Sequence, residues 1–272
     1  IARDLYDEDK KVLDELAGKY GNTVCYYPPD EKMMEGFTIR ATHNRLSLAA
    51  YYRCFLSAIL PANVDRVLYL DCDIVITGHI AGLWQTPMDE NTAIAAIEDT
   101  GCREKQRYDI LKYPESDSYF NSGVMLINLA YWRQHDIAQA CVDFYHKHPE
   151  RIIFNDQDLL NCVLHNHKKL VDLQWNVQDG FYRNVPAFSD EWRKTHADIL
   201  KNPVILHYTN RKPWNYDSQH PLRHLYFKYW DLTPWKGQRP WSSLTNRLKR
   251  FFRLLPFHIG ARKAKYIQLE SL

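Results

Sequence analysis

The chain has 272 residues, 45% of them hydrophobic and 25% charged, which is the composition of a globular protein with room for one large α/β domain and a small appendage. No apolar run reaches the roughly 18 residues of a transmembrane helix, and the charged start IARDLYDEDKK matches neither a signal peptide nor a transit peptide. The six dispersed cysteines form no C-x-x-C pair, which argues against a disulfide framework and a zinc site and predicts a reducing cytoplasm.

Helical and strand patterns alternate along the chain. Apolar periodicity predicts helices over residues 7–21, 45–60 and 155–166, with a short helical piece at 79–85. Apolar runs predict strands over residues 22–28, 67–76, 92–99, 122–129 and 202–209. The first helix is expected to have Asp7 as its N-cap, an apolar stripe of Val12, Leu13 and Leu16, and Gly21 at its end. This alternation predicts an open α/β sheet.

The net charge of +2 hides an uneven distribution. Residues 232–269 contain nine Lys or Arg and no Asp or Glu, whereas residues 1–231 contain 26 basic and 32 acidic residues, a balance of −6. We therefore predict a catalytic-size domain over residues 1–215 and a basic, aromatic C-terminal tail over residues 216–272.

Two acidic residues interrupt the most apolar predicted strand, VLYLDCDIVI. Asp71 and Asp73 are two positions apart, so they share a face of an extended chain, and where the strand ends they could converge on one point. Two neighbouring carboxylates repel unless one is protonated or a cation lies between them. Mg²⁺ or, with an added imidazole, Mn²⁺ would satisfy them. The alternative is one aspartate that caps a loop and one that is solvated.

Other polar residues follow the predicted strands. Asp99 and His207 come at the ends of the strands 92–99 and 202–209. In open α/β sheets, ligands gather at the carboxyl ends of the strands. Asp71, Asp73, Asp99 and His207 are therefore candidates for one ligand site.

Four ordered blocks carry a family resemblance. They are RVLYLDCDIVITGHIAGLW, YFNSGVMLINLAYW, FNDQDLLNCVL and LHYTNRKPWN. Together they resemble the retaining glycosyltransferases of family 8, which include bacterial lipopolysaccharide galactosyl- and glucosyltransferases and glycogenin. The similarity runs from about residue 7 to residue 215. It implies a GT-A fold, with an open Rossmann-like mixed sheet flanked by helices, that uses UDP-galactose or UDP-glucose.

The resemblance also implies residue roles at the donor phosphates. Asp71, Asp73 and His207 would hold Mn²⁺ or Mg²⁺ against the diphosphate, and Lys212 would contact it as a point charge. Without the resemblance, His207 would be a structural hydrogen-bonding residue and Lys212 a solvated lysine. Relatives carry a glycine between this histidine and lysine. Here Asn210 is the best substitute, since asparagine tolerates left-handed backbone geometry.

Further roles are implied around the donor sugar and the acceptor. The resemblance assigns them to Asn121, Asp156 and Gln157, with Gln157 facing the anomeric carbon. An amide is a poor nucleophile, so we favour front-face transfer over a covalent glycosyl-enzyme. Arg53 matches an arginine that touches the donor, the alternative being a helix-surface arginine. Asp99 matches a residue that contacts donor or acceptor hydroxyls, the alternative being a loop cap.

For Asn155 and Asp156 the alternative is that they simply cap the helix that follows.

The start of the chain departs from the family pattern. Relatives begin with a strand and loop that grip the nucleotide base, whereas this chain is expected to start inside the second strand, at IARDL. About thirty residues, the size of a strand–helix unit, would then be absent. Without that strand, the chain would be expected to expose an edge of its sheet and to bind UDP weakly.

The tail contains an amphipathic segment, WSSLTNRLKRFFRLLP. Its basic residues fall around one apolar helical face, and Pro256 is expected to end the helix. The apolar face consists of Leu244, Leu248, Phe251, Phe252 and Leu255. This pattern predicts a helix that lies on an anionic membrane surface. The alternative is a helix packed on the catalytic domain with a solvated basic rim. A nucleic-acid partner is not expected, because the acidic body offers no continuous basic groove.

The predicted protein is thus a metal-dependent hexosyltransferase that uses a UDP-sugar and a saccharide acceptor, such as a lipopolysaccharide or another lipid-linked glycan. It is expected in the cytoplasm, on the inner face of the cytoplasmic membrane. LYLDCDIVIT also fits the D-x-D-x-[TV] signature of haloacid-dehalogenase phosphatases, although that family needs the motif on its first strand and a late G-D pair that this chain lacks. A non-catalytic sugar-binding relative is a third alternative.

Overall fold

The computed structural model describes residues 5–39, 47–185 and 188–272. These residues form two compact units. Unit 1 runs to Tyr69 and resumes over Thr86–Val171, and unit 2 comprises Leu70–Gln85 and Asp172–Leu272. The part of IARDL before Leu5 and the first two residues of the predicted 45–60 helix lie outside the described residues.

Unit 1 is built on a mixed four-stranded sheet of order β1-β4-β3-β5. Its strands are β1 (Arg66–Leu70), β3 (Ile94–Glu98), β4 (Phe120–Asn128) and β5 (Lys168–Leu170). Strand β3 pairs antiparallel with β4 and parallel with β5. The register of β3 and β4 shifts after Ala96, which places Asn121 opposite Ile97 at the end of the ladder. The predicted strands over 92–99 and 122–129 are confirmed.

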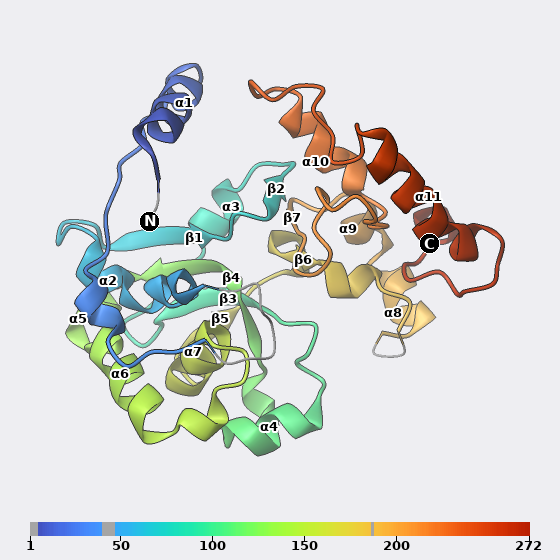
Figure 1. The fold of residues 1–272 in the computed structure, drawn as a ribbon. Helices are drawn as coiled ribbons and strands as arrows, with labels where there is room; N and C mark the ends of the chain where they lie inside the picture. The colour runs from blue at the N-terminus through green and yellow to red at the C-terminus, as the bar shows by residue number, and fades with distance from the viewer. Residues whose placement is uncertain (1–4, 40–46, 186–187) are drawn as a thin grey trace. The chain divides into compact units, whose positions relative to one another are not determined.

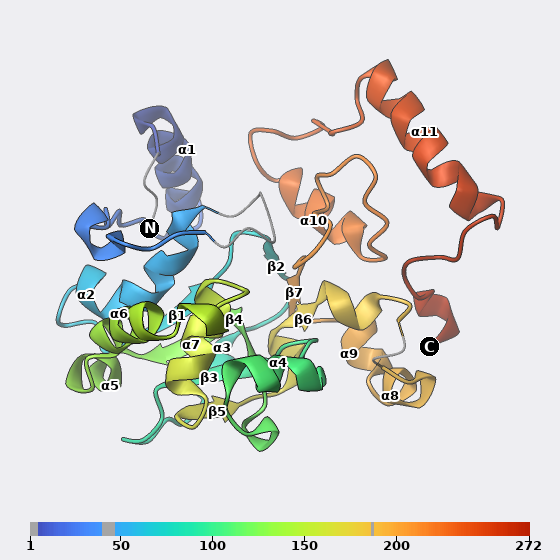
Figure 2. The ribbon, with the colours of Figure 1, turned by 60° about the horizontal axis from the view of Figure 1, so that its bottom comes forward.

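Helices flank this sheet (Figures 1 and 2). They are α2 (Leu56–Ile59), α4 (Lys105–Leu111), α5 (Leu129–Gln134), α6 (Ile137–Lys147) and α7 (Asp156–Leu164), and unit 1 also contains α1 (Asp7–Gly18), which buries no side chain. Helix α7 packs against β4 and α6 packs against α7. Short 3-10 turns cover Glu31–Met34, Glu115–Asp117 and Pro149–Arg151, and a longer 3-10 segment covers Leu48–Phe55. The predicted 155–166 helix is confirmed. The 45–60 segment is mostly 3-10 and ends before Pro61, as expected.

Unit 2 has its own three-stranded sheet of order β2-β7-β6. Its strands are β2 (Ile74–Ile76), β6 (Val177–Gln178) and β7 (Ile205–His207), and its helices are α3 (Ala81–Trp84), α8 (Asp190–Thr195), α9 (Ala197–Lys201), α10 (Arg223–Trp230) and α11 (Leu244–His258). It also contains 3-10 turns at Leu173–Trp175, Asp179–Tyr182 and Leu269–Ser271. Strand β7 pairs antiparallel with β2 and parallel with β6. The predicted helical piece at 79–85 and strand at 202–209 are confirmed, in shorter form.

The C-terminal residues belong to the core of unit 2. Tyr266, Ile267, Leu269 and Leu272 pack against buried residues that include Tyr182 and Leu206. The backbone N–H of Ile267 donates to the carbonyl of Tyr182 at 2.9 Å. The end of the chain is therefore part of the folded unit.

Several local predictions are wrong. Residues 22–28 form no strand in the described structure and are mostly exposed, because no neighbouring strand pairs with them. Helix α1 begins after the N-cap Tyr6, so Asp7 is its first residue, and it ends at Gly18. Gly21, with a φ of 69°, lies in the turn that follows. No side chain of α1 is fully buried: Val12 and Leu16 are half-buried and Leu13 is exposed, so its apolar stripe is only partly covered. Pro256 lies inside α11 and does not end it.

The predicted 67–76 strand is also interrupted. It separates into β1 and β2, and Asp71–Asp73 lies between them outside both ladders. A charged carboxylate buried in an apolar sheet would be costly, whereas a break lets Asp71 and Asp73 reach polar partners. The single sheet expected from the alternating pattern is accordingly two sheets in the described residues.

A buried histidine makes unit 2 sensitive to acid. His220 is 3% exposed, and its ring lies 4.8–5.6 Å from those of Tyr182, Tyr208 and Tyr266. Its Nδ1 accepts a 3.1 Å hydrogen bond from the backbone N–H of Leu222. Burial, with a smaller contribution from the charge of His224, lowers the pKa of His220 to about 3. The folded protein therefore keeps this imidazole neutral where the unfolded chain would protonate it.

This difference predicts the pH dependence of stability. Between about pH 6.5 and pH 3 the unfolded chain binds the extra proton, so stability falls as the pH falls. From pH 7 to pH 4.5 we expect His220 to contribute a loss of roughly 2–3 kcal/mol. In His220→Asn, an amide oxygen can still accept from Leu222 N–H, as in an Asx-turn, but does not titrate. Between pH 7 and pH 4.5 the melting temperature should depend less on pH in the variant than in the wild type. An equal dependence in both proteins would contradict a role of His220 in the acid sensitivity.

Candidate functional site

Asp71, Asp73 and His207 converge in unit 2. The two aspartates lie in the break between β1 and β2, and His207 is the last residue of β7, paired with Ile74. Nε2 of His207 is 3.1 Å from Oδ1 of Asp73 and 3.7 Å from Oδ2 of Asp71. One ligand atom from each residue lies within 4.8 Å of the others. The convergence predicted from the sequence is therefore present.

A buried asparagine orients the imidazole. Nδ1 of His207 is 3.0 Å from Oδ1 of Asn176, which is fully buried. An amide oxygen can only accept, so Nδ1 donates to Asn176 and Nε2 is the nitrogen that faces the two carboxylates. A second hydrogen bond of this kind is typical of histidines that bind metals. No local pattern in the sequence marks Asn176 as a functional residue.

Lys212 approaches the same carboxylates. Its ammonium contacts Asp73 and donates to the carbonyl of Tyr208 at 2.7 Å. Although burial acts to raise it, the pKa of Asp73 is held well below its ordinary value by the hydrogen bond and charge of His207 and by the charge of Lys212. Asp73 is thus an anion throughout the neutral range.

These side chains fit a hard divalent cation. Two carboxylates and one imidazole are the donor set expected for Mn²⁺, and carboxylates alone suit Mg²⁺. Nε2 of His207 faces the carboxylates, and Asp73 is anionic, so both groups are placed where a metal could bind them. Lys212 would balance the charge of an anionic ligand on the cation.

Asn210 lies elsewhere in the loop. It lines a hollow of about 190 Å³ with Arg183, Arg211 and Lys265, among others. Its backbone does not have the positive φ expected for a glycine substitute. The prediction of a left-handed residue at Asn210 is therefore wrong. The loop is instead ordered by the side chain of Asn215, which accepts from Lys212 N–H at 3.0 Å.

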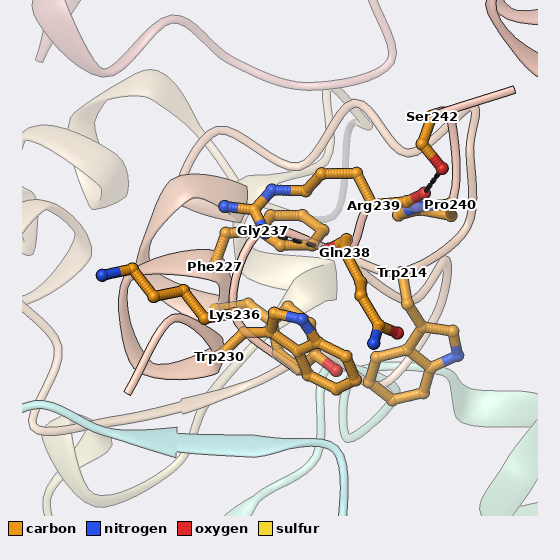
Figure 3. Close-up of a pocket in the computed structure, with 10 residues that line it drawn as sticks. Trp214, Phe227, Trp230, Lys236, Gly237, Gln238, Arg239, Pro240 and Ser242 are labelled. Atoms are coloured by element: carbon orange, nitrogen blue, oxygen red, sulfur yellow. Dashed lines mark hydrogen bonds between the residues drawn. The ribbon is translucent and has the colours of Figure 1, made fainter. Parts of the chain in front are cut away.

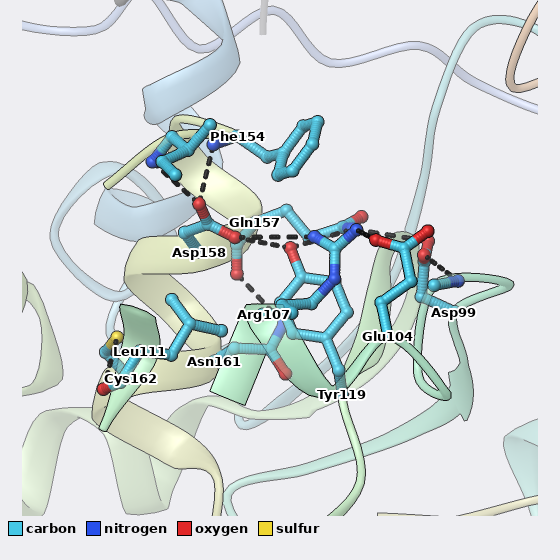
Figure 4. Close-up of polar contacts among 12 residues, drawn as sticks. Asp99, Glu104, Arg107, Leu111, Tyr119, Phe154, Gln157, Asp158, Asn161 and Cys162 are labelled. Atoms are coloured by element: carbon cyan, nitrogen blue, oxygen red, sulfur yellow. Dashed lines mark hydrogen bonds and ion pairs between the residues drawn. The ribbon is translucent and has the colours of Figure 1, made fainter. Parts of the chain in front are cut away.

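A second polar cluster lies in unit 1, around Gln157 (Figure 4). Its Nε2 donates to Oδ2 of Asp99 at 3.2 Å, and its Oε1 accepts from Nδ2 of Asn121 at 3.1 Å. Asn121 also donates to Asp99 at 2.9 Å. The structure thus brings together three of the residues that the family resemblance implied.

Asp99 also accepts from the backbone N–H of Gly101 at 2.8 Å. The loop-capping alternative for Asp99 is therefore present together with its contact to Gln157. One carboxyl group serves both, through different oxygens.

Buried charges behind Gln157 support this cluster. The Tyr119 hydroxyl accepts from Nε2 of Gln157 at 3.0 Å and donates to Oδ1 of Asp158 at 2.6 Å. Oδ2 of Asp158 accepts from the backbone N–H groups of Ile153 and Phe154. Arg107 lies 3.9 Å from Asp158 and stacks over the ring of Tyr119 at 4.3 Å. The sequence analysis missed Tyr119, Asp158 and Arg107.

Arg53 is buried beside Asp156. Its Nε is 3.0 Å from Oδ2 of Asp156, and its Nη1 donates to the carbonyl of Ser122 at 2.9 Å. Arg53 is 9% exposed and stacks over Tyr69 at 4.6 Å. The helix-surface alternative for Arg53 is wrong, because the 3-10 segment turns this side chain inward.

The backbone before α7 is unusual. Asn155, the N-cap of α7, has φ 51° and ψ −123° and makes no side-chain capping hydrogen bond. A non-glycine residue in a sparsely populated region of backbone space costs about 1–3 kcal/mol and tends to occur at functional sites. The simple capping alternative thus does not describe Asn155, and its backbone sets the direction from which Asp156 and Gln157 leave the loop.

The fold is that of a known glycosyltransferase. A crystal structure of the galactosyltransferase LgtC in complex with donor and acceptor sugar analogues matches with a TM-score of 0.74 at 21% identity, covering 87% of this chain and 84% of that one. The mixed sheets flanked by helices are therefore a GT-A fold, as expected.

The sequence comparisons define the family. The profile of "Glycosyl transferase family 8" matches residues 1–218, so the chain belongs to this family and is a glycosyltransferase. "General stress protein A" of Bacillus subtilis is 30% identical over 84% of this chain and 79% of its own length. The "Lipopolysaccharide 1,3-galactosyltransferase" of Salmonella typhimurium is 30% identical over 92% of this chain and 74% of its own length.

Proposed function

We propose that this glycosyltransferase is a metal-dependent, retaining hexosyltransferase that moves galactose or glucose from a UDP-sugar to a saccharide acceptor, such as a lipopolysaccharide or another lipid-linked glycan. The observation that carries the proposal is the convergence of His207 on Asp71 and Asp73, with Lys212 beside them. A similar chain that is named a lipopolysaccharide galactosyltransferase supports the choice of hexose and acceptor.

In this proposal, unit 2 residues bind the diphosphate of the donor. Asp71, Asp73 and His207 would hold Mn²⁺ or Mg²⁺, which supplies electrostatic stabilisation of the departing UDP. The ammonium of Lys212 would move from Asp73 toward a phosphate oxygen and neutralise developing charge. Asn176 keeps the imidazole aimed at the metal position. Asn210, in the same loop, is proposed to contact the donor with its side chain.

Unit 1 residues are proposed to bind the donor sugar and the acceptor. Gln157 would face the anomeric carbon, held by Asp99 and Asn121. The buried pair of Arg53 and Asp156 would form the polar wall beside the sugar. Oε1 of Gln157 accepts from Asn121 and from Ser122 N–H, and Nε2 donates to Asp99, so the side-chain amide would be held in one orientation beside the sugar. This amide is proposed to position the substrate and not to act as a nucleophile. The acceptor proton would pass to the leaving phosphate oxygen in a front-face transfer.

The alternatives receive less support. The match to glycosyl transferase family 8 gives no support to a haloacid-dehalogenase phosphatase. A non-catalytic role is disfavoured by family membership and by the intact ligand set.

Metal affinity tests the proposal. In Asn176→Ala the imidazole loses the hydrogen bond that orients it, so the Mn²⁺ concentration for half-maximal UDP release from UDP-galactose or UDP-glucose should rise about 10- to 100-fold. The rate at saturating Mn²⁺ should change much less, and EDTA should abolish turnover of the wild type. The exposed Asn202→Ala serves as the matched control. An EDTA-resistant wild type would refute metal dependence, and an unchanged Mn²⁺ requirement would refute the role of Asn176.

The proposal includes attachment of the C-terminal tail to an anionic membrane surface at the cytoplasmic face. No helix in the described parts of the chain is both long and apolar enough to cross a bilayer. In α11, Leu244, Leu248, Phe251 and Phe252 are 50–72% exposed, while Leu254 is buried. An apolar face turned to solvent on a basic helix supports a membrane surface over a helix that packs this face on the catalytic domain.

Vesicle binding tests the attachment. Deletion of residues 241–272 is unsuitable, because Tyr266–Leu272 belongs to the core of unit 2. We expect Leu248→Gln/Phe252→Gln to reduce co-sedimentation with phosphatidylglycerol-rich vesicles at least 10-fold, since each buried apolar side chain contributes on the order of 1–2 kcal/mol. The control Leu13→Gln/Leu232→Gln removes exposed leucines outside α11 and should bind like the wild type. Equal loss in both variants would contradict a role specific to α11.

A further inference from the structure

An aromatic cavity lies in unit 2, apart from the metal-binding residues. Its volume is about 690 Å³, within the range of small-molecule sites. It is formed by one face of α10, by the loop after α10 and by the segment that follows Lys212 (Figure 3). The side chains that lead into it are Trp214, Tyr226, Phe227, Trp230, Lys236 and Gln238.

Hydrogen bonds hold the loop in its conformation. Asp231 accepts from Gly237 N–H at 3.0 Å and from both terminal nitrogens of Arg239, at 2.9 and 2.6 Å. Nε1 of Trp230 donates to the carbonyl of Trp235 at 2.7 Å. Gly237 has a φ of 78°, which permits the turn. The cavity wall is therefore organised before any ligand binds, which lowers the entropic cost of binding.

Polar groups in the cavity remain available. Arg239 is engaged by Asp231 and lies over the ring of Phe227 at 4.6 Å. By contrast, no hydrogen bond or ion pair among the described residues engages the side-chain amide of Gln238 or the ammonium of Lys236. In Figure 3 the Gln238 side chain extends toward the indoles of Trp214 and Trp230. Flat apolar rings thus stand beside an unused side-chain amide, whereas the ammonium of Lys236 extends away from them in Figure 3.

We propose that this cavity binds a pyranose ring of the acceptor glycan, at a sugar other than the one that receives the transferred hexose. A pyranose has an apolar C–H face, which suits an indole, and a rim of hydroxyl groups, which suits the side-chain amide of Gln238. This proposal rests on the proposed function, since it takes the acceptor to be an oligosaccharide.

The position of the cavity in the chain supports an acceptor role. Trp214 follows Lys212 by two residues, so their Cα atoms are at most about 7 Å apart. Lys212 contacts Asp73. A glycan held on Trp214 would therefore remain near the segment that binds the donor phosphates. Binding energy from such a remote sugar raises the efficiency of transfer to long acceptors over short ones.

Saccharide binding tests the proposal directly. The probes are the methyl α- and β-glycosides of glucose and galactose, lactose and maltose, measured by saturation-transfer NMR and by tryptophan fluorescence. At least one should bind the wild-type protein, and Gln238→Ala should weaken that binding at least 5-fold with an unchanged melting temperature. The exposed Gln85→Ala is the matched control and should bind like the wild type.

Three outcomes would overturn the proposal: no probe binds the wild type, Gln238→Ala binds as well as the wild type, or UMP displaces the bound saccharide. In transfer assays Gln238→Ala should raise the KM for a disaccharide acceptor and leave acceptor-independent UDP release unchanged. Failure of the proposed function is distinguishable, because metal-independent UDP release would refute that function while the saccharide measurement still reports on this cavity.

Discussion

Asp73→Asn should lower the rate of UDP-sugar turnover by about 10²–10³-fold at a fixed Mn²⁺ concentration, the usual cost of removing one group that stabilises a transition state electrostatically. The amide keeps the size of the side chain but removes the charge that His207 and Lys212 contact. A neutral amide is a weak ligand for a hard cation, so part of the activity should return at higher Mn²⁺. Steady-state UDP release measured over a range of Mn²⁺ concentrations checks this expectation.

The control is Asp109→Asn, the same chemical change at an exposed position of α4. It should retain wild-type activity. Melting temperatures of both variants should stay close to that of the wild type, because Asp73 lies in a loop outside the strand ladders. Wild-type turnover in a folded Asp73→Asn protein would remove the basis for metal-assisted transfer.

Asp158→Ala should destabilise unit 1 by about 3–5 kcal/mol, the usual cost of removing one partner of a buried, hydrogen-bonded charge. The Asp158 side chain is 2% exposed and accepts from Tyr119 and from two backbone N–H groups. Those donors, and the guanidinium of Arg107, would be left in a largely dry environment. For a unit of this size the midpoint of thermal unfolding should fall by roughly 10 °C.

Glu104→Gln provides a matched control for this effect. Glu104 also pairs with Arg107, at 3.0 Å, but its side chain is 65% exposed. An exposed ion pair contributes about 0–1 kcal/mol, so this variant should melt within a few degrees of the wild type. Similar losses in both variants would show that Arg107, and not the burial of Asp158, dominates the stability of this cluster.

Asp158 is a positioning residue as well as a structural one. Through Tyr119 it is linked to the amide of Gln157, the group proposed to face the anomeric carbon. The stability of unit 1 and the orientation of Gln157 therefore share one hydrogen-bond network. This connection explains why a buried acid, whose pKa is raised by burial, is retained directly behind the proposed sugar-binding residues.

Local sequence patterns were sufficient to predict the strands and the helix with the clearest apolar periodicity. The apolar runs that became β3, β4 and β7 and the amphipathic pattern of α7 are local signals that tertiary context reinforced. The two acids in VLYLDCDIVI predicted a shared ligand, although the break in their strand became evident only from the structure. The ordered blocks then indicated His207 as the third member, some 130 residues along the chain.

The polar residues that support these sites could be identified only from contacts in the folded structure. Asn176 orients His207, and Tyr119 joins Gln157 to Asp158, through contacts between segments that carry no local signal in common. Arg53 was ambiguous for the same reason, since its burial depends on Ser122 and Asp156, far along the chain. The apolar segment 22–28 has strand propensity but no partner in the described structure. Local sequence specifies propensity and periodicity, whereas burial and hydrogen-bond partners depend on what the rest of the chain brings alongside.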